Sequence, residues 1–226
     1  MPPKPKYTKE EITDSAFELV RTDGPDALTA REVGKRLGVS SSPIFTFFKD
    51  MDELKAAVVN RAKSCFDEYM VVAEKYYPSF KKHGMQFVRF ASDEPQLFKL
   101  LFMQSAGREK KFENAIDVIP FGKKEDIDII KRDYHATEEE AHRLFNQMWI
   151  YTYGLCVLCA SGVCTFSDEE ISMRLGEIFR GMTAVISADA EKADAENPSF
   201  LLPFVKESDA YETVKKSGPD FSKYAL

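Results

Sequence analysis

Apolar residues recur at intervals of three and four along most of this 226-residue chain. That spacing is typical of amphipathic helices, and no stretch alternates as a half-buried strand would. The predicted helices cover residues 8–23, 29–37, 41–48, 51–77, 80–91, 94–104, 124–134, 137–162 and 167–190. The fold class is therefore predicted to be all-α, with three short helices at the N-terminus followed by a bundle of longer ones.

Four of these helices begin at a capping box, in which a Ser or Thr is followed three residues later by a Glu. The pairs are Thr8 with Glu11, Thr29 with Glu32, Thr137 with Glu140, and Ser167 with Glu170. Because each side chain accepts a hydrogen bond from a free backbone N–H of the first turn, the pairs predict where the helices start.

Residues 29–54 have the pattern of two short helices joined by a tight turn and followed by a third. Gly34 allows a close approach of the chain, and Gly38 can adopt the positive φ of a turn. Residues 40–42 are serines that can cap the next helix, and Pro43 is tolerated in its first turn. This is the pattern of a helix-turn-helix unit, whose second helix enters the major groove of DNA.

The same residues resemble the DNA-binding domain of TetR-family transcriptional regulators. The resemblance covers about residues 8–60 and rests on the Thr-capped helix, a Gly-Val-Ser turn, an aromatic cluster and an acidic-Leu pair. Here these are Thr29, Gly38-Val39-Ser40, Phe45-x-Phe47-Phe48 and Asp52-x-Leu54. Family members usually have Tyr, His and Lys where Phe45, Phe47 and Met51 stand.

The helix-turn-helix pattern and the resemblance together imply a double-stranded operator DNA as partner. Residues at the start of the second helix are expected to contact base edges, and basic residues around it to contact phosphates. The predicted DNA-binding residues are Lys6, Thr29, Arg31, Ser40, Ser41, Ser42, Pro43, Phe45, Thr46, Phe47 and Lys49.

Charge is distributed unevenly along a chain whose net charge is −6. Bases dominate residues 29–49 and the N-terminal arm, whereas acids dominate residues 165–226. A basic head on an acidic body suits a protein that touches DNA at one end. The predicted domains are a DNA-binding head (1–50), a ligand-binding and dimerisation body (51–190) and a tail that packs on the body (191–226). No apolar run is long enough to span a membrane, and no signal segment is recognised, so a cytoplasmic location is expected.

The helices predicted over 137–162 and 167–190 each carry an apolar seam with steps of three and four. Two copies of such a pair could form a four-helix homodimer interface, although the spacing alone also fits an intramolecular core. The TetR resemblance favours the dimer, and residues 149–162 look like a family branch with a Trp-His-Gly motif, in which Tyr153 replaces the His. The predicted interface residues are Phe145, Met148, Thr152, Leu155, Cys159, Leu175, Ile178, Met182 and Val185.

Aromatic and Met side chains from several predicted helices are expected to converge on one apolar cavity. Such residues are also ordinary core, but TetR-family proteins bind small inducers within the body. The predicted ligand-binding residues are Phe66, Tyr69, Met70, Gln86, Phe87, Phe90, Phe98, Phe102, Met103 and Trp149. A largely apolar small molecule is the expected effector, and no cofactor is expected.

Other chemistry is poorly supported by the residue patterns. The three histidines do not form the spacing of a helical zinc site, and no phosphate loop or nucleophile elbow is present, so neither a metal nor an enzyme is predicted. Cys156 and Cys159 could sense oxidants, but packed apolar residues are the better interpretation. The predicted function is a dimeric repressor released from its operator by the effector. The alternatives are a helical ligand-binding or interaction protein with weakened DNA binding, an unrecognised enzyme, or a redox-sensing regulator.

Overall fold

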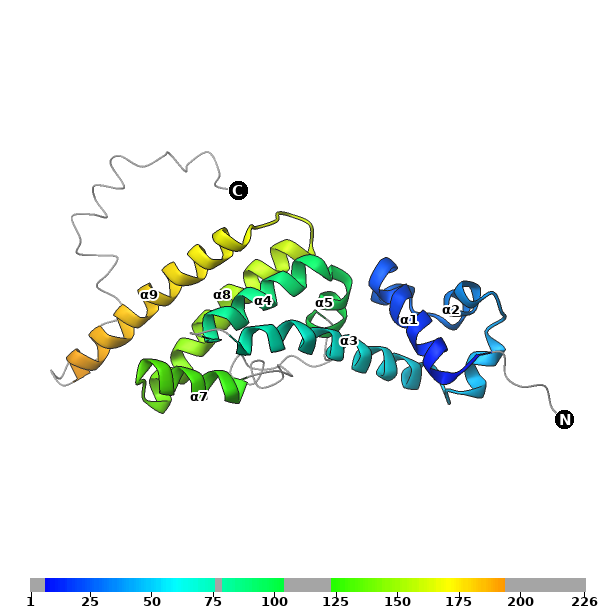
Figure 1. Ribbon diagram of the computed structural model, residues 1–226, viewed down its shortest axis with the longest axis horizontal. Coiled ribbons are helices and arrows are strands. Elements are labelled where there is room, and N and C mark those ends of the chain that lie inside the picture. The colour runs from blue at the N-terminus through cyan, green and yellow to red at the C-terminus, as the bar shows by residue number, and fades with distance from the viewer. Residues whose placement is uncertain (1–6, 76–78, 104–122, 194–226) are drawn as a thin grey trace, which may run out of the picture. The chain divides into compact units, whose positions relative to one another are not determined.

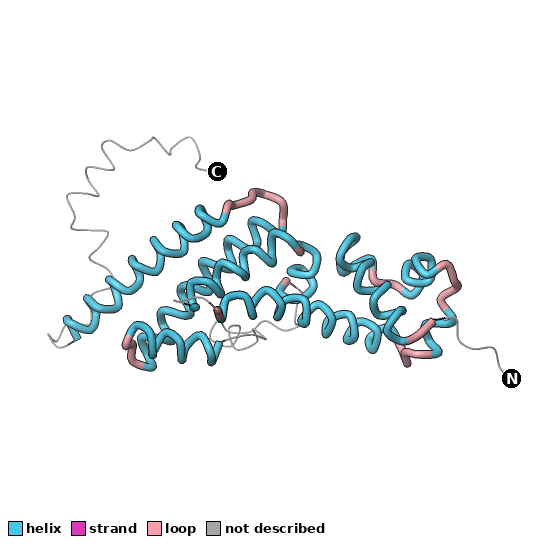
Figure 2. The backbone as a smooth tube through the Cα atoms, viewed as in Figure 1, coloured by secondary structure: helices cyan, strands magenta, loops and turns pink. Residues whose placement is uncertain are grey.

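The computed structural model describes residues 7–75, 79–103 and 123–193, and every regular element in these ranges is helical (Figures 1 and 2). The all-α prediction is confirmed. The α-helices are α1 (Lys9–Asp23), α2 (Ala30–Leu37), α3 (Met51–Glu74), α4 (Ser79–Asp93), α5 (Pro95–Phe102), α7 (Lys123–Tyr134), α8 (Glu138–Ala160) and α9 (Asp168–Ala193). Two short 3-10 helices, η1 (Pro25–Ala27) and η2 (Ser42–Thr46), complete the set.

The predicted helix starts agree well with the structure because side-chain caps determine them. Thr8 and Thr137 form complete capping boxes with Glu11 and Glu140. Ser167 and Glu170 exchange the same two hydrogen bonds, at 2.8 and 3.3 Å. At Thr29 only the forward bond forms, from the Glu32 backbone N–H to the Thr29 hydroxyl.

The α-helix predicted over residues 41–48 is wrong in type, since η2 occupies only Ser42–Thr46. Pro43 has no N–H to donate, and no side chain caps the element. The residues that follow Pro43 are β-branched or aromatic and have low helix propensity. A short 3-10 turn forms instead, with the Phe47 N–H donating to the Ile44 carbonyl at 3.1 Å.

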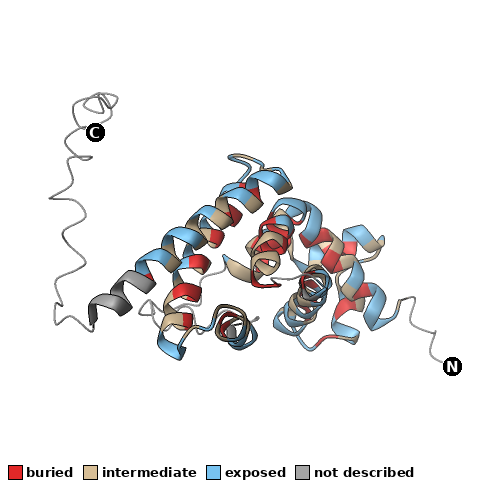
Figure 3. Ribbon diagram, turned by 60° about the vertical axis from the view of Figure 1, so that its left-hand side comes forward, coloured by how far each residue is buried: buried red, intermediate tan, exposed pale blue. Residues whose placement is uncertain are grey.

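The chain divides into two compact units, Met1–Arg180 and Gly181–Leu226. Within the first unit, α1 packs on α2, α3 and α5, and α4 packs on α3, α7 and α8. Buried positions gather on the inner sides of these helices (Figure 3). The predicted connection over residues 107–124 and the tail 191–226 lie largely outside the described residues, as does Lys6.

Candidate functional site

The turn between α2 and η2 depends on two glycines. Gly38 ends α2 in the left-handed conformation, at φ 69°, which favours glycine. Gly34 lies against the backbone of the turn, because a Cβ at this position would stand 2.9 Å from the Val39 carbonyl oxygen. The chain therefore folds back sharply on α2, as the helix-turn-helix pattern predicts.

The N-terminal segment buries apolar side chains, and its first helix is anchored to α3. Ile44 and Phe48 are buried, and the Lys9 ammonium lies 4.7 Å from the centre of the Phe48 ring. The Glu53 carboxylate accepts from the Lys9 ammonium at 2.6 Å and from the Lys49 backbone N–H at 2.8 Å. These bonds hold the first residue of α1 to the start of α3 and fix the exit from η2.

Most of the predicted DNA contacts lie on the outside of the head. Among the described candidates, Ser41, Pro43 and Phe47 are half-buried and the rest are exposed, namely Thr29, Arg31, Ser40, Ser42, Phe45, Thr46 and Lys49. Phe45 is 47% exposed. Met51 is half-buried at the first position of α3.

The body contains a cluster of aromatic rings from α3, α4 and α5. The ring of Phe66 lies edge-on to those of Phe87, Phe90 and Phe102, with centroids 5.1 to 5.8 Å apart. Phe98 packs on Phe87 and Phe102. These contacts show that aromatic side chains from three helices pack against one another.

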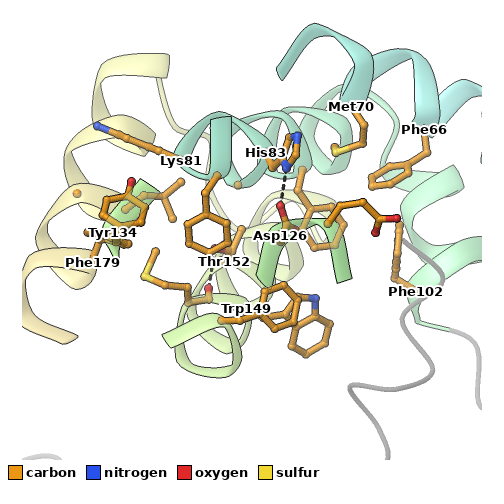
Figure 4. A pocket seen from close by; sticks show the side chains of 18 of the residues that line it. Phe66, Met70, Lys81, His83, Phe102, Asp126, Tyr134, Trp149, Thr152 and Phe179 are labelled. Atoms are coloured by element: carbon orange, nitrogen blue, oxygen red, sulfur yellow. Dashed lines mark hydrogen bonds and ion pairs between the residues drawn. The ribbon is translucent and has the colours of Figure 1, made fainter. Parts of the chain in front are cut away.

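A cavity of about 590 Å³ opens beside this cluster (Figure 4). It is lined from α3, α4, α5, α7, α8 and α9, and its volume is within the range of small-molecule sites. Of the ten predicted ligand-binding residues, five line it: Phe66, Met70, Phe87, Phe102 and Trp149.

The other five predicted residues lie outside this cavity for identifiable reasons. Phe90 and Phe98 are fully buried within the ring cluster, and Gln86 is also buried. The Tyr69 hydroxyl donates to the Asp93 carboxylate at 3.3 Å, and burial, followed by Asp93, raises the pKa of Tyr69 to about 12. Met103 is 43% exposed. Helical spacing predicted which side chains turn inward but not which of them border the empty volume.

Charged residues also line the cavity, and sequence reasoning missed them. They are Asp67, Lys81, His83, Glu125, Asp126 and Arg180. His83 Nδ1 lies 2.5 Å from Asp126 Oδ1, with both side chains largely buried. Burial raises the pKa of the Asp126 carboxyl, and the His83 hydrogen bond partly opposes this. The pair joins α4 to α7 across 43 residues, so no local spacing could have predicted it.

The apolar seam of α8 is used within the protomer. Its five predicted interface residues are buried, namely Phe145, Met148, Thr152, Leu155 and Cys159. The first three face the cavity, as does the predicted interface residue Leu175 of α9. Ile178 and Met182 are half-buried, and Val185 is 38% exposed. The apolar seam of α8 therefore belongs to the core of the protomer, because α8 packs its apolar side on α4 and α7.

The cysteines of α8 are poor candidates for redox chemistry. All four cysteines of the chain are free, and Cys156 and Cys159 are buried. Burial raises the pKa of both thiols, so the reactive thiolate is scarce at neutral pH. This favours their interpretation as packed apolar side chains.

In residues 7–75, 79–103 and 123–193, no three His, Cys, Asp or Glu side chains gather as a metal site would require. None of the helices in those ranges is both long and apolar enough to cross a bilayer.

Comparison with known proteins identifies a family and several relatives. Residues 12–58 match the family model described as bacterial regulatory proteins of the tetR family. A segment of 99 residues is 29% identical to an HTH-type transcriptional repressor of Mycobacterium tuberculosis, covering 43% of this chain but only 38% of that protein. An uncharacterized HTH-type transcriptional regulator of Haemophilus influenzae is 26% identical over 113 residues, 48% of this chain and 55% of its own length.

Two crystal structures are similar over most of the chain. A TetR-like transcriptional regulator from Rhodococcus sp. RHA1 superposes with a TM-score of 0.59 at 14% identity, covering 80% of this chain and 99% of that one. A putative TetR-family regulator from Mesorhizobium loti gives 0.51 at 14% identity, covering 78% and 95%. At this identity the likeness concerns the fold alone. The head thus matches the tetR family of bacterial regulatory proteins in sequence, and the chain as a whole has a TetR-like all-α fold.

Proposed function

We propose that this protein is a DNA-binding transcriptional repressor that a small effector releases from its operator. The observation that carries the proposal is the close turn at Gly34 and Gly38, which presents η2 on the surface of the head. Exposed hydroxyls of Ser42 and Thr46 on η2 suit base edges, and the exposed cations Arg31 and Lys49 suit phosphates. The division into a head (1–50), a body (51–190) and a tail (191–226) is part of this proposal.

We propose that the effector binds in the body of the protein. A cavity of about 590 Å³ has room for a small molecule, and α3 runs from the head to the cavity wall at Phe66 and Met70. An effector weakens DNA binding only if its affinity differs between two arrangements of the heads. We therefore propose that α3 transmits effector binding from the cavity to the head. No catalytic role is proposed for the cavity.

A second function is favoured by the side chains at two positions. Phe45 and Met51 cannot donate hydrogen bonds to phosphates, so the head could have lost most of its operator affinity. The protein would then be a helical ligand-binding or interaction protein. Operator binding separates the two functions.

The DNA-binding proposal predicts a salt-dependent gel shift of the DNA upstream of the protein's own gene, because phosphate contacts release counterions. Met51→Lys should strengthen this binding by roughly tenfold, as a charge-assisted hydrogen bond to phosphate does. Val72→Lys adds the same charge at an exposed position far along α3 and should have little effect. No shift for the natural protein at low salt would favour the second function. Equal effects of the two lysines would show that Met51 does not face the DNA backbone.

The proposed homodimer needs a surface that the protomer leaves open. On α8, Ile150 is 41% exposed, Leu158 is 38% exposed, and Gly154 between them has open space around it. These three share one face at intervals of four, opposite the buried seam. We propose that this outer face of α8, rather than the seam, contacts the second copy.

Ile150→Arg should therefore raise the dimer dissociation constant at least about tenfold, because an unpaired charge in an apolar interface costs several kcal/mol. Sedimentation over a range of concentrations measures this. Val71→Arg is the matched control, since Val71 is 50% exposed on α3. An undisturbed dimer for Ile150→Arg would exclude this face. Thr152→Arg would not test the interface, because Thr152 is buried in the protomer.

A further inference from the structure

An acid and a histidine are paired on the wall of the cavity. Asp126 of α7 and His83 of α4 both line it, and His83 Nδ1 lies 2.5 Å from Asp126 Oδ1. Their side chains are only 14% and 16% exposed. In Figure 4 the pair lies between Lys81 and the ring of Phe102. The pair therefore places a largely buried carboxylate within reach of a molecule in the cavity.

His83 uses only one of the two carboxylate oxygens of Asp126. In the part of the chain that the structure describes, no hydrogen bond or ion pair is made to the other oxygen, Oδ2. Oδ2 is also not among the side-chain atoms of these residues that are closed off from solvent without a partner, which are Ser15 Oγ, Asn146 Oδ1 and Arg174 Nε. It is thus an accessible acceptor. Because an ionised carboxylate only accepts hydrogen bonds, the group that pairs with Oδ2 must be a donor.

Leaving this oxygen without a donor is costly in such surroundings. Burial raises the pKa of the Asp126 carboxyl, although the hydrogen bond with His83 opposes the rise. The cavity is also bordered by Phe66, Phe87 and Phe102, whose side chains have no N–H or O–H to donate. A donor group on a bound molecule therefore lowers the cost of keeping the carboxylate charge out of water.

The charges around the cavity favour an uncharged donor over an ammonium group. Carboxylates and cations both line it, namely Asp67, Glu125 and Asp126 together with Lys81 and Arg180. A charged ligand loses its own hydration on entering and meets side chains of both signs. A hydroxyl group donates equally well to Asp126 and is much cheaper to take out of water.

We propose that the cavity takes an uncharged compound in which an aromatic body carries a hydroxyl group. The hydroxyl donates to Asp126 Oδ2, and His83 holds the carboxylate in place. The aromatic body packs against Phe87, Phe102 and Trp149, because ring–ring contacts add to the burial of apolar area. This inference rests on the proposed function only in treating the cavity as the effector site, and it names the chemical class of the effector.

Two isomeric probes separate the hydroxyl from the apolar body. The compounds para-propylphenol and para-ethylanisole contain the same atoms, but only the phenol can donate a hydrogen bond. Calorimetry measures their binding to the DNA-free protein, and the emission of Trp149, the only tryptophan of the chain, reports whether they enter the cavity that it lines. The phenol is expected to bind roughly tenfold more tightly, since a hydrogen bond to a charged group adds this much.

Substitutions at Asp126 test which atom the hydroxyl meets. Asp126→Asn should reduce the preference for the phenol, because an amide oxygen is a weaker acceptor than a carboxylate. Asp126→Leu should bring the ratio to about one, because no acceptor remains at this position. Asp128→Asn is the matched control, since Asp128 is exposed two residues further along α7 and does not line the cavity. It should keep the natural ratio.

Equal binding of the two isomers to the natural protein would overturn the proposal. So would tighter binding of para-propylbenzoate or para-propylbenzylammonium than of the phenol, or a Trp149 emission that no probe changes. A ratio that both substitutions at Asp126 leave unaltered would also overturn it. Because DNA is absent from these titrations, a failure of operator binding leaves the result intact. Phenol binding that does not alter an observed operator shift would instead contradict the release step of the proposed function.

Discussion

Phe90→Ala is expected to lower the free energy of unfolding by roughly 3–5 kcal/mol, as loss of a fully buried phenylalanine does. Phe90 is fully buried, and its ring centre lies 5.1 Å from that of Phe66 and 5.4 Å from that of Tyr69. Truncation removes these edge-on contacts and leaves a void among rings from α3 and α4 that cannot fully collapse. Denaturant unfolding followed by circular dichroism measures the loss.

Phe102→Ala is the matched comparison for Phe90. Phe102 belongs to the same cluster but is only half-buried and lines the cavity. Its truncation should enlarge an existing space, cost less stability than Phe90→Ala and change the binding of apolar ligands more. Equal losses of stability in the two variants would contradict the assignment of Phe90 to the core and Phe102 to the cavity wall.

Helix positions were predictable because the information lies in a few neighbouring residues. Thr137 and Glu140 identify the start of α8 by themselves, since the two hydrogen bonds of the capping box join residues three apart. The turn at Gly34 and Gly38 was predictable for the same reason. The type of η2 was not, because Ser42 and Pro43 resemble the first turn of an α-helix while the residues that follow do not favour one.

The candidate site was predictable only in part, because a cavity is a property of packing between distant residues. Periodicity assigned Phe87 and Phe90 to the same inward side of α4, yet only Phe87 borders the empty volume. The charged lining is still harder to predict, since Lys81 and Arg180 are ordinary charged residues until α4 and α9 bring them together at the cavity.

The α8 seam shows a different limit of sequence reasoning. Apolar residues spaced three and four apart predict that one side of a helix is buried. They do not show which element covers that side. Thr152 could bury itself because its hydroxyl donates to the Met148 carbonyl at 2.7 Å within the same helix. No intermolecular partner is needed to satisfy it. The α8 seam therefore packs within the protomer.

The junction between head and body provides the second large expected effect. Arg21 of α1 donates from Nε to the Glu94 carboxylate at 2.8 Å and makes a second bond from its terminal nitrogen. Glu94 occupies the N-cap position of α5 without a side-chain cap hydrogen bond, and its side chain is 7% exposed, whereas that of Arg21 is 43% exposed. The pair holds the head to the helix that carries Phe102 of the cavity wall.

Arg21→Leu should lower the free energy of unfolding by about 2–3 kcal/mol, because it leaves the Glu94 carboxylate buried and unpaired. This is less than for a fully buried pair, since Arg21 already lies partly in water. Glu94→Gln should cost less, about 1 kcal/mol, because the amide oxygen still accepts from Arg21 and the released cation reaches solvent. The double variant should be more stable than Arg21→Leu alone, since the buried charge is gone.

If the junction transmits the effector signal, Arg21→Leu should also bring operator affinities with and without the effector closer together. Arg61→Leu is the control, because Arg61 pairs with Asp14 at 3.6 Å between α3 and α1, and both of these side chains are exposed. It should leave stability and effector response nearly unchanged. A double variant as unstable as the sum of the single ones would show that Arg21 and Glu94 do not act as a pair. An unaltered effector response in Arg21→Leu would assign the coupling to α3 alone.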